Sequence, residues 1–316
     1  MSRAIAVTGL FGVLMVLTLT SNAGTSSKGE DGERNVEFGP WTAAVNLGPI
    51  VNSEFAEGGV GISSDGLALY FQSTRHSAGS DPDLYVARRA AVDLPWEAPR
   101  NLGAVVNSLA SDSAPDLSRD GHYLFFASLR SGDSDIYVSS RRDIHDDFAW
   151  EMPAALPAPV NGPSLDAGSS YFLPRHGRPQ LYFASDRANG LGIDGLDIYM
   201  TESRTDGTWT EPTFVAEVNS AFQDARPAIR VDGLEMVFHS ARDGNNDLFA
   251  SRRNHVWEPW SAPEKIGMPI NTGAAEFQAA LSANGRTLYF GSTRPGGSGA
   301  SDLYASTRAK VRRDHH

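Results

Sequence analysis

Short apolar stretches alternate with polar turns along this chain, without a sustained helical period. Between Asn101 and Arg142, for example, an Asp-Gly pair and a loop rich in Gly, Ser and Asp bound the apolar stretches YLFFAS and DIYVS. Apolar stretches of this length between turn residues predict β-strands. The Asp-Gly pair predicts a type I′ hairpin, because both central residues of that turn need a positive φ. The chain is therefore expected to be all-β.

The pattern occurs in five copies. Each copy has a Trp, then an Asn, an acid five residues after the Asn, a turn pair ending in Gly, a Ser-x-Arg segment, and an Asp before an apolar-aromatic pair. The tryptophans are Trp41, Trp96, Trp150, Trp209 and Trp260. The acids are Glu57, Asp112, Asp166, Asp224 and Glu276. Agreement at so many positions in register indicates a structural repeat.

Each copy has room for four short strands, which with the turn-rich composition is typical of a β-propeller blade. Five copies predict an all-β, five-bladed β-propeller with four-stranded antiparallel blades. The expected blades are 57–102, 112–156, 166–215, 224–266 and 276–308. The segment 41–48 is expected to supply the last blade's fourth strand from the N-terminal side. This closes the ring and covers two sheet edges that could otherwise pair with other chains.

The repeat resembles a known family. Its pattern Trp…Pro…Asn-Ser…Asp…Pro…Leu-Ser-x-Asp-Gly…Leu-Tyr-Phe-x-Ser-x-Arg…Asp-Ile-Tyr is similar to the WD-like repeat of TolB-like propellers and many bacterial envelope proteins. The resemblance covers nearly the whole chain after its N-terminal segment and implies the fold. It does not specify a function, because that family includes protein-interaction scaffolds, polysaccharide lyases and other members.

The segments outside the repeats predict export. Arg3, an apolar run from Ala4 to Leu19 and the residues SNA before Gly24 indicate a cleaved signal peptide over 1–23. An uncleaved anchor is less favoured, because the run is shorter than the ~20 residues that span a bilayer. Residues 24–40 are expected to form a flexible linker, 41–308 the propeller, and 309–316 a basic tail. The protein is thus expected to be periplasmic or extracellular, with no membrane span after cleavage.

Composition excludes several function classes. The net charge of −11 argues against a nucleic-acid partner. The absence of cysteine excludes disulfides, thiol nucleophiles, thiolate metal sites and a lipid-modified cysteine anchor. We expect a monomer without a cofactor, whose partner is an envelope or extracellular protein or a polysaccharide.

The arginine of each Ser-x-Arg segment suggests a structural brace. The arginines are Arg75, Arg130, Arg187, Arg242 and Arg294, and the third-strand aspartates are Asp83, Asp135, Asp197, Asp247 and Asp302. Because every copy carries both, we expect each arginine to pair with the third-strand aspartate of its own blade. A planar guanidinium suits such a bidentate contact. A ring of ligand-binding arginines is the less favoured alternative.

The five repeated acids begin the innermost strands, so they should converge near one mouth of the central channel. Three roles are open for them. They could be structural, they could hold Ca²⁺ as an oxygen-rich ring, or some could be catalytic, as in five-bladed glycosidases of the arabinanase type. A glycosidase needs two carboxylates in different roles. Presence of the acid in every blade favours the structural role.

Residues that break the repeat are the better candidates for function. The x of the Phe-x-Ser segments is Gln72, Ala127, Ala184, His239 and Gly291. The residue two positions after each acid is Gly59, Ala114, Gly168, Arg226 and Gln278, where small residues are expected because blades crowd near the axis. Asp116 is the exception in the next slot of the same strand face, and Phe55 and Phe222 enter at matching positions. Ordinary packing is an equal alternative for each of them.

Together these residues predict one site, at the mouth where the acids lie. The preferred function is a binding module for a partner protein or a glycan. Its expected ligand contacts are His239, Arg226, Gln278, Gln72, Asp116, Phe55, Phe222 and Glu276. The alternative is a carbohydrate-active enzyme, a glycoside hydrolase or polysaccharide lyase, with carboxylates chosen from Glu57, Asp112 and Asp224. In blade three, His176 is expected to be a turn residue at the opposite mouth. The long loop from Ala188 to Asp197 is expected to be a lid, a specificity element or a tolerated insertion.

Overall fold

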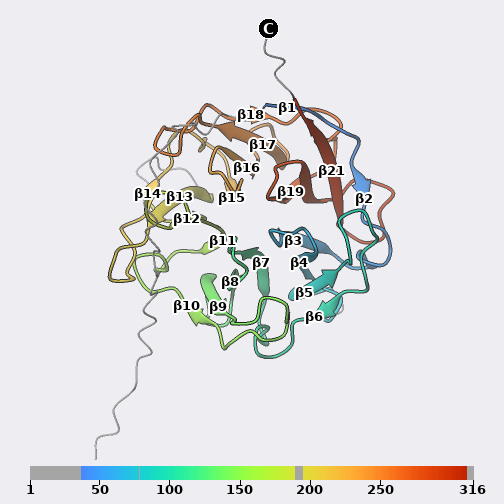
Figure 1. Ribbon diagram of the computed structural model, residues 1–316, viewed down its shortest axis with the longest axis horizontal. Helices are drawn as coiled ribbons and strands as arrows, with labels where there is room; N and C mark the ends of the chain where they lie inside the picture. The colour runs from blue at the N-terminus through green and yellow to red at the C-terminus, as the bar shows by residue number, and fades with distance from the viewer. Residues whose placement is uncertain (1–36, 78, 189–194, 312–316) are drawn as a thin grey trace, which may run out of the picture.

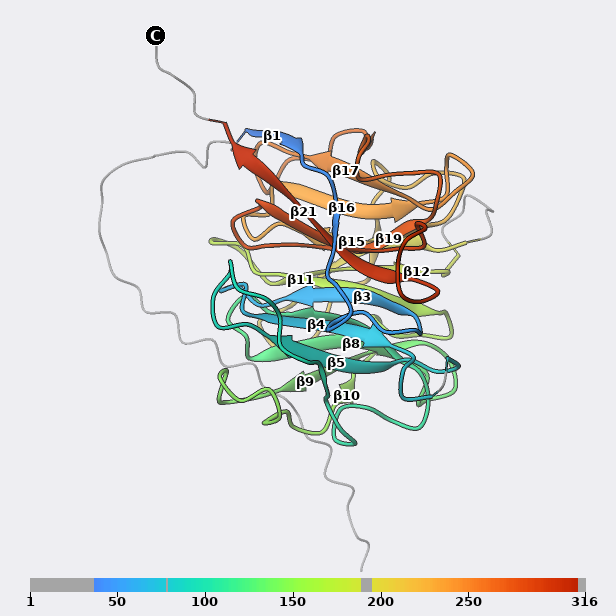
Figure 2. The same ribbon diagram turned by 90° about the vertical axis from the view of Figure 1, so that its right-hand side faces the viewer.

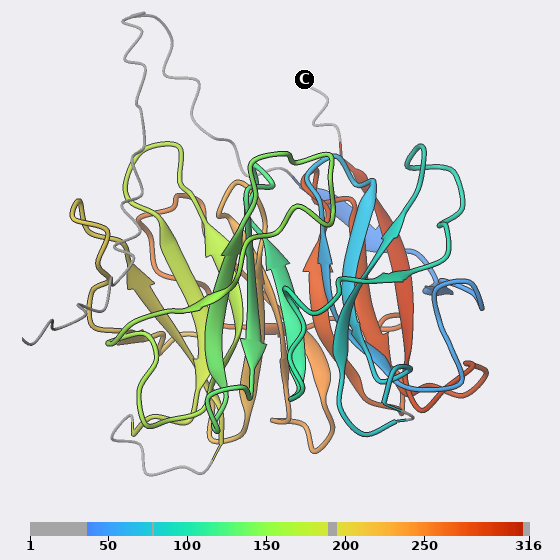
Figure 3. The same ribbon diagram turned by 90° about the horizontal axis from the view of Figure 1, so that it is seen from below.

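Five antiparallel sheets surround a central axis in the computed structural model, which describes residues 37–77, 79–188 and 195–311 (Figure 1). The innermost strands β3, β7, β11, β15 and β19 face the axis, and each chain segment then runs outward through its own sheet. Figure 3 shows the strands of neighbouring blades side by side, running roughly along the ring axis. The predicted five-bladed β-propeller is thus confirmed.

The blades begin and end close to the predicted positions. Blade one contains β3 (Glu57–Ile62), β4 (Ala68–Ser73), β5 (Asp83–Arg88) and β6 (Arg100–Asn101). Blade two contains β7 (Asp112–Leu117), β8 (Tyr123–Ser128), β9 (Asp135–Ser140) and β10 (Ala154–Ala155). Blade three contains β11 (Asp166–Phe172), β12 (Gln180–Ser185), β13 (Asp197–Glu202) and β14 (Thr213–Phe214). Blade four contains β15 (Asp224–Ile229), β16 (Glu235–Ser240), β17 (Asp247–Arg252) and β18 (Glu264–Lys265).

Blade five is built from both ends of the described chain. Its inner strands are β19 (Glu276–Leu281), β20 (Thr287–Ser292) and β21 (Asp302–Lys310), and both β2 (Val45–Asn46) and β1 (Phe38–Trp41) pair with β21. Figure 2 shows β1 beside the C-terminal end of β21. The predicted closure is confirmed. One boundary differs, because β1 begins at Phe38, inside the segment expected to be linker.

The repeated tryptophans hold the outer part of the ring together. Arg308 lies over the ring of Trp41 at 4.3 Å, and Phe38 stacks on the same guanidinium at 3.9 Å. Equivalent stacks pair Arg89 with Trp96, Arg141 with Trp150 and Arg253 with Trp260. Trp41, although it lies before the first blade in sequence, therefore has the same role in blade five that Trp96, Trp150 and Trp260 have in their own blades.

The hairpins between first and second strands differ from the predicted turn type. In blade one, the N–H of Gly66 donates to the carbonyl of Ser63, and Gly66 has a φ of 74°. Asp65 is not among the residues with positive φ, nor are its counterparts in the other blades. The turn is therefore a type I turn followed by a left-handed glycine rather than type I′. The Asp65 carboxylate instead accepts hydrogen bonds from Ser63 and from the N–H of Leu67.

Several predictions concern residues outside the described part of the chain. The signal peptide over 1–23, most of the linker and most of the basic tail lie there, as do residues 189–194 of the long loop in blade three. Among the described residues there is no helix that could cross a membrane.

Candidate functional site

The five repeated acids are structural braces. Each carboxylate is at most 1% exposed and accepts a hydrogen bond from the Ser-x-Arg arginine of its own blade. The pairs are Glu57–Arg75 at 3.0 Å, Asp112–Arg130 at 2.6 Å, Asp166–Arg187 at 2.6 Å, Asp224–Arg242 at 2.5 Å and Glu276–Arg294 at 3.2 Å. The expected partner of each arginine was therefore wrong: it is the inner-strand acid, and not the third-strand aspartate.

The remaining hydrogen-bonding capacity of these groups is also used locally. Asp224, for example, accepts from the backbone N–H and the hydroxyl of Ser220, both at 2.6 Å. Arg242 donates to the carbonyl of Val218 and stacks over the ring of Phe249. The predicted third-strand partner has other contacts: in blade one Asp83 accepts from the amide of Asn101. A carboxylate held this way is not free to meet a substrate, so the structural role is favoured for Glu57, Asp112, Asp224 and Glu276.

The position two residues after each acid has an unusual backbone conformation. All five residues there have a positive φ, between 48° and 59°: Gly59, Ala114, Gly168, Arg226 and Gln278. Each lies in a β-bulge, where the register with the second strand shifts. Crowding at the axis is therefore one of two reasons for small residues here. The other is that glycine tolerates a positive φ. A long side chain here carries a backbone cost of about 1–2 kcal/mol, which makes Arg226 a candidate for function.

Three of the predicted ligand residues instead join neighbouring blades. The Oε1 atom of Gln72 accepts a hydrogen bond from the N–H of Ala114 at 3.0 Å. Gln278 accepts through its Oε1 from the N–H of Gly59, and its own N–H donates to Nδ1 of His239 at 3.5 Å. In each case the donor is a left-handed residue of the next blade around the ring. Gln72, Gln278 and His239 thus each connect two neighbouring blades near the axis.

His239 is unsuited to proton transfer. It is 4% exposed. Burial, together with a smaller effect of the nearby Arg226 charge, lowers its pKa to about 3. The imidazole is therefore neutral at physiological pH and acts as a hydrogen-bond acceptor.

A cavity of about 100 Å³ occupies the axis and is lined by the inner strands of all five blades. We call its two ends the acid end, where the inner strands begin, and the turn end, where they lead into the first hairpins. The cavity opens at the turn end, past Ser64, Arg119, Leu173, Val231 and Ala283. The cavity thus faces away from the acid end, where the sequence places the site, and that position stays a prediction. Arg226, Gln278 and Asp116 line it, whereas His239 and Gln72 do not.

The two predicted aromatic walls do not belong to this cavity. Phe55 and Phe222 lie at the acid end, and the side chain of Phe222 is 53% exposed. The carbonyl of Phe55 accepts a hydrogen bond from the N–H of Ala300, which joins blade one to the last loop of blade five. His176 is an exposed turn residue, as predicted, but its turn lies at the same end as the opening.

Asp116 is the carboxylate in the channel wall. It is half-buried and accepts one hydrogen bond, from the N–H of Tyr171 at 2.7 Å. Burial raises the pKa of the Asp116 carboxyl to about 7, because one backbone hydrogen bond does not offset the loss of water. Asp116 can therefore exchange a proton near neutral pH.

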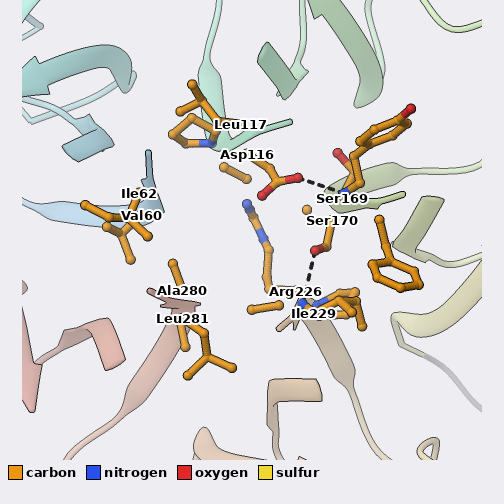
Figure 4. A pocket seen from close by; sticks show the side chains of 18 of the residues that line it. Val60, Ile62, Asp116, Leu117, Ser169, Ser170, Arg226, Ile229, Ala280 and Leu281 are labelled. Atoms are coloured by element: carbon orange, nitrogen blue, oxygen red, sulfur yellow. Dashed lines mark hydrogen bonds between the residues drawn. The ribbon is translucent and has the colours of Figure 1, made fainter. Parts of the chain in front are cut away.

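Arg226 extends into the channel beside it. Its side chain lies over Gly168, where an added Cβ would come within 2.2 Å of the arginine Cδ. Figure 4 shows the guanidinium directed toward Asp116, with Ser170 and Ser169 close by. Among the described residues, the buried Nη1 of Arg226 and the Oγ of Ser169 have no hydrogen-bond partner. Burial lowers the pKa of Arg226 to about 10, so it remains a cation at neutral pH.

Sequence reasoning identified Arg226 and Asp116 as exceptions to the repeat, but it did not find Ser169. That serine looks ordinary in the sequence, since serine is common in this chain, and its missing partner appears only in three dimensions. No cluster of three or more His, Asp or Glu that could hold a metal occurs in residues 37–77, 79–188 and 195–311. The possible Ca²⁺ in the channel stays a prediction, without a donor cluster to support it.

Comparisons with known proteins give the fold. No family model matches the sequence, and no curated protein does. An endo-arabinase from Bacteroides thetaiotaomicron has a TM-score of 0.54 at 17% identity, over 87% of this chain and 100% of that one. An arabinanase from Bacillus subtilis has 0.56 at 14% identity, over 83% and 96%. The catalytic domain of an α-L-arabinofuranosidase from Coprinopsis cinerea has 0.57 at 12%, over 85% and 98%.

At these identities the similarity establishes the fold and nothing finer. The resemblance of the repeat to TolB-like propellers stays a prediction, because no family model supports it. The chain is a five-bladed β-propeller that shares its architecture with solved structures of glycoside hydrolases.

Proposed function

We propose that this protein binds a carbohydrate at the turn end of its axial channel, through Arg226, Asp116 and Ser169. The observation that carries the proposal is the buried Nη1 of Arg226, which has no partner among the described residues although it lies in a cavity open to solvent. Leaving a buried donor unpaired costs about 1–3 kcal/mol, and more for a charged group. A ligand that accepts this hydrogen bond would recover that energy.

The chemistry of the lining suits a sugar. Asp116 accepts hydrogen bonds when ionised and donates one when protonated, Arg226 donates, and Ser169 does both. Sugar hydroxyls likewise donate and accept. Ile62, Leu117 and Leu281 line the same cavity and offer apolar contact for the carbon face of a ring. Pockets that bind small molecules combine an apolar wall with a few such polar groups.

The structural neighbours agree with this class of ligand. Their names describe an endo-arabinase, an arabinanase and two arabinofuranosidases. By analogy of fold, this favours the carbohydrate over a partner protein, which remains an untested alternative. Location in the periplasm or outside the cell, expected from the N-terminal segment, would give access to such glycans.

Glycoside hydrolysis is the second candidate, and the raised pKa of Asp116 favours it. A carboxyl that exchanges its proton near neutral pH is suited to general acid–base catalysis. The usual mechanism needs a second carboxylate on the other side of the scissile bond. Glu57, Asp112 and Asp224, considered for this from the sequence, are each held by an arginine. We therefore place binding ahead of hydrolysis.

Isothermal titration calorimetry with arabino-, xylo- and galacturono-oligosaccharides tests the proposal. We expect at least one to bind, and Asp116→Ala and Arg226→Met each to weaken it about tenfold or more. The control is Arg175→Met, because Arg175 is an exposed residue of the blade-three turn at the same end. Absence of binding by all of these sugars would contradict the proposal. Release of reducing ends, lost in Asp116→Asn, would identify a hydrolase.

A further inference from the structure

Arg226 differs from the other arginines near the axis in having no acidic partner. The arginines of the five Ser-x-Arg segments each pair with a carboxylate. Arg226 forms no ion pair with a described residue. Burial lowers its pKa, which means that the charged form is disfavoured at this place. A cation removed from water without a partner is costly. An anion bound beside it would offset that cost.

The N–H groups at three of the five left-handed positions donate to a side chain of a neighbouring blade, and two positions differ. Ala114, Gln278 and Gly59 donate their left-handed N–H groups to Gln72, His239 and Gln278, respectively. In the other two blades, Gly168 and Arg226 occupy the left-handed position.

Gln72 and His239 lie on second strands and accept from the left-handed residue of the next blade. The matching second-strand residues before Gly168 and Arg226 are Ala127 and Ala184. An alanine side chain has no acceptor. At this position the second strands of blades two and three therefore offer no side-chain acceptor.

The remaining groups on this side are compatible with an anion. Ser169 is 6% exposed, and its hydroxyl has no partner among the described residues. Burial raises the pKa of Tyr171 to about 12 and lowers that of His239 to about 3, so both are neutral. Arg119 at the rim adds a second positive charge. Asp116 faces Arg226 and is negative when ionised. It would have to be protonated when an anion binds, because two negative groups side by side repel each other.

The cavity limits the size of the bound group. Its volume of about 100 Å³ is smaller than the ~150 Å³ cavity that accommodates benzene in an engineered protein. A whole oligosaccharide does not fit, but a carboxylate on the end of a sugar does. The rest of the ligand would then lie over the turn end of the channel.

We propose that the deep end of the channel binds the carboxylate of an acidic sugar between Arg226 and Ser169, so that the glycan recognised carries a uronic acid. This inference rests on the proposed carbohydrate function and adds the chemical class of the ligand. Protonated Asp116 would donate to the same carboxylate. Binding of the anion should then be accompanied by proton uptake and should tighten as the pH falls through about 7.

Calorimetric titration of the full chain with galacturonate and galactose, which differ in the carboxylate, tests this inference. Inorganic sulfate is the third ligand. We expect galacturonate to bind about tenfold or more tighter than galactose, the amount expected for a hydrogen-bonded charge. Arg226→Met and Ser169→Ala should remove this preference, while Arg175→Met retains it. If Arg226→Met does not fold, Arg226→Lys takes its place in the test. This variant keeps the charge and should retain part of the preference for galacturonate.

The outcomes separate the two proposals. Equal affinity for galacturonate and galactose would overturn the anion site and leave the carbohydrate function in place. Binding of sulfate without either sugar would overturn the carbohydrate function and reduce the site to one for a small oxyanion. If neither these three ligands nor the oligosaccharides named above bind, both proposals fail, and Arg226 only fills the channel.

Discussion

The guanidinium of Arg226 is directed across the channel toward the carboxyl of Asp116, yet the two form no ion pair with each other. Both groups depart from the repeat, both are held away from water, and the pKa of each is shifted toward the neutral form. Elsewhere near the axis, acids and arginines meet at 2.5–3.2 Å. This pair is the exception, and both of its members line the cavity that opens at the turn end.

We predict that Arg226→Gly stabilises the protein. Arg226 has a φ of 57°, which glycine adopts without strain, and the substitution also removes a buried unpaired charge. Relief of the backbone strain alone should contribute about 1–2 kcal/mol. Chemical denaturation would measure this as a higher midpoint with an unchanged slope. A loss of stability would instead mean that Arg226 serves packing. Gly168→Ala should have the opposite effect and destabilise the protein, because its Cβ would clash with the side chain of Arg226.

Asp116 should make stability depend on pH. Its pKa is about 7 in the folded protein, above the usual value of an aspartate near 4. A group with a raised folded pKa contributes stability that is fully present below its unfolded pKa and is lost as the pH rises through the folded pKa. The melting temperature of the wild type, relative to Asp116→Asn, should therefore fall between about pH 4 and pH 7. A difference that stays constant over this range would contradict the assignment.

The arginine braces should matter for stability in every blade. Arg130→Met leaves the buried carboxylate of Asp112 without its cation, which typically costs about 3–5 kcal/mol. Arg75→Met and Arg242→Met should behave alike, since the geometry repeats. Urea denaturation would measure these losses, with the exposed Arg175→Met as the neutral control. A variant that kept full stability but lost function would restore a catalytic role for the acid in its blade.

Closure of the ring depends on the N-terminal strands. Trp41→Ala removes the ring that stacks on Arg308, and Phe38→Ala removes a second ring on the same guanidinium. Both rings are half-buried, so each loss should cost less than the about 3–5 kcal/mol of a core aromatic, and both variants should unfold earlier and aggregate more readily. Trp257→Ala is the matched control, because Trp257 is 76% exposed. Equal melting temperatures for the Trp41 and Trp257 variants would contradict the closure.

The fold could be predicted because its signals are local and repeated. The five acids mark the starts of the inner strands, and Trp41 stands before the first complete blade where the closing strand is needed. Each signal occurs several times, so an error in one copy is corrected by the others.

The candidate site could be predicted only in part, because it depends on contacts between distant residues. Arg75 had two acids within reach of its sequence position, Glu57 and Asp83, and only the folded loop selects Glu57. The β-bulge that gives Arg226 its positive φ leaves no mark in the hydrophobic pattern. Departure from the repeat did identify Asp116 and Arg226. It also singled out Gln72, Gln278 and His239, whose hydrogen bonds to neighbouring blades form only in the folded ring.

A crystal structure of the protein with bound galacturono-oligosaccharide would show where the sugar lies. We predict a sugar over the turn end of the channel, with its carboxylate on Nη1 of Arg226 and an oxygen within hydrogen-bonding distance of Asp116. A sugar bound at the acid end beside Phe222, or on the outer rim of the propeller with the channel empty, would contradict it.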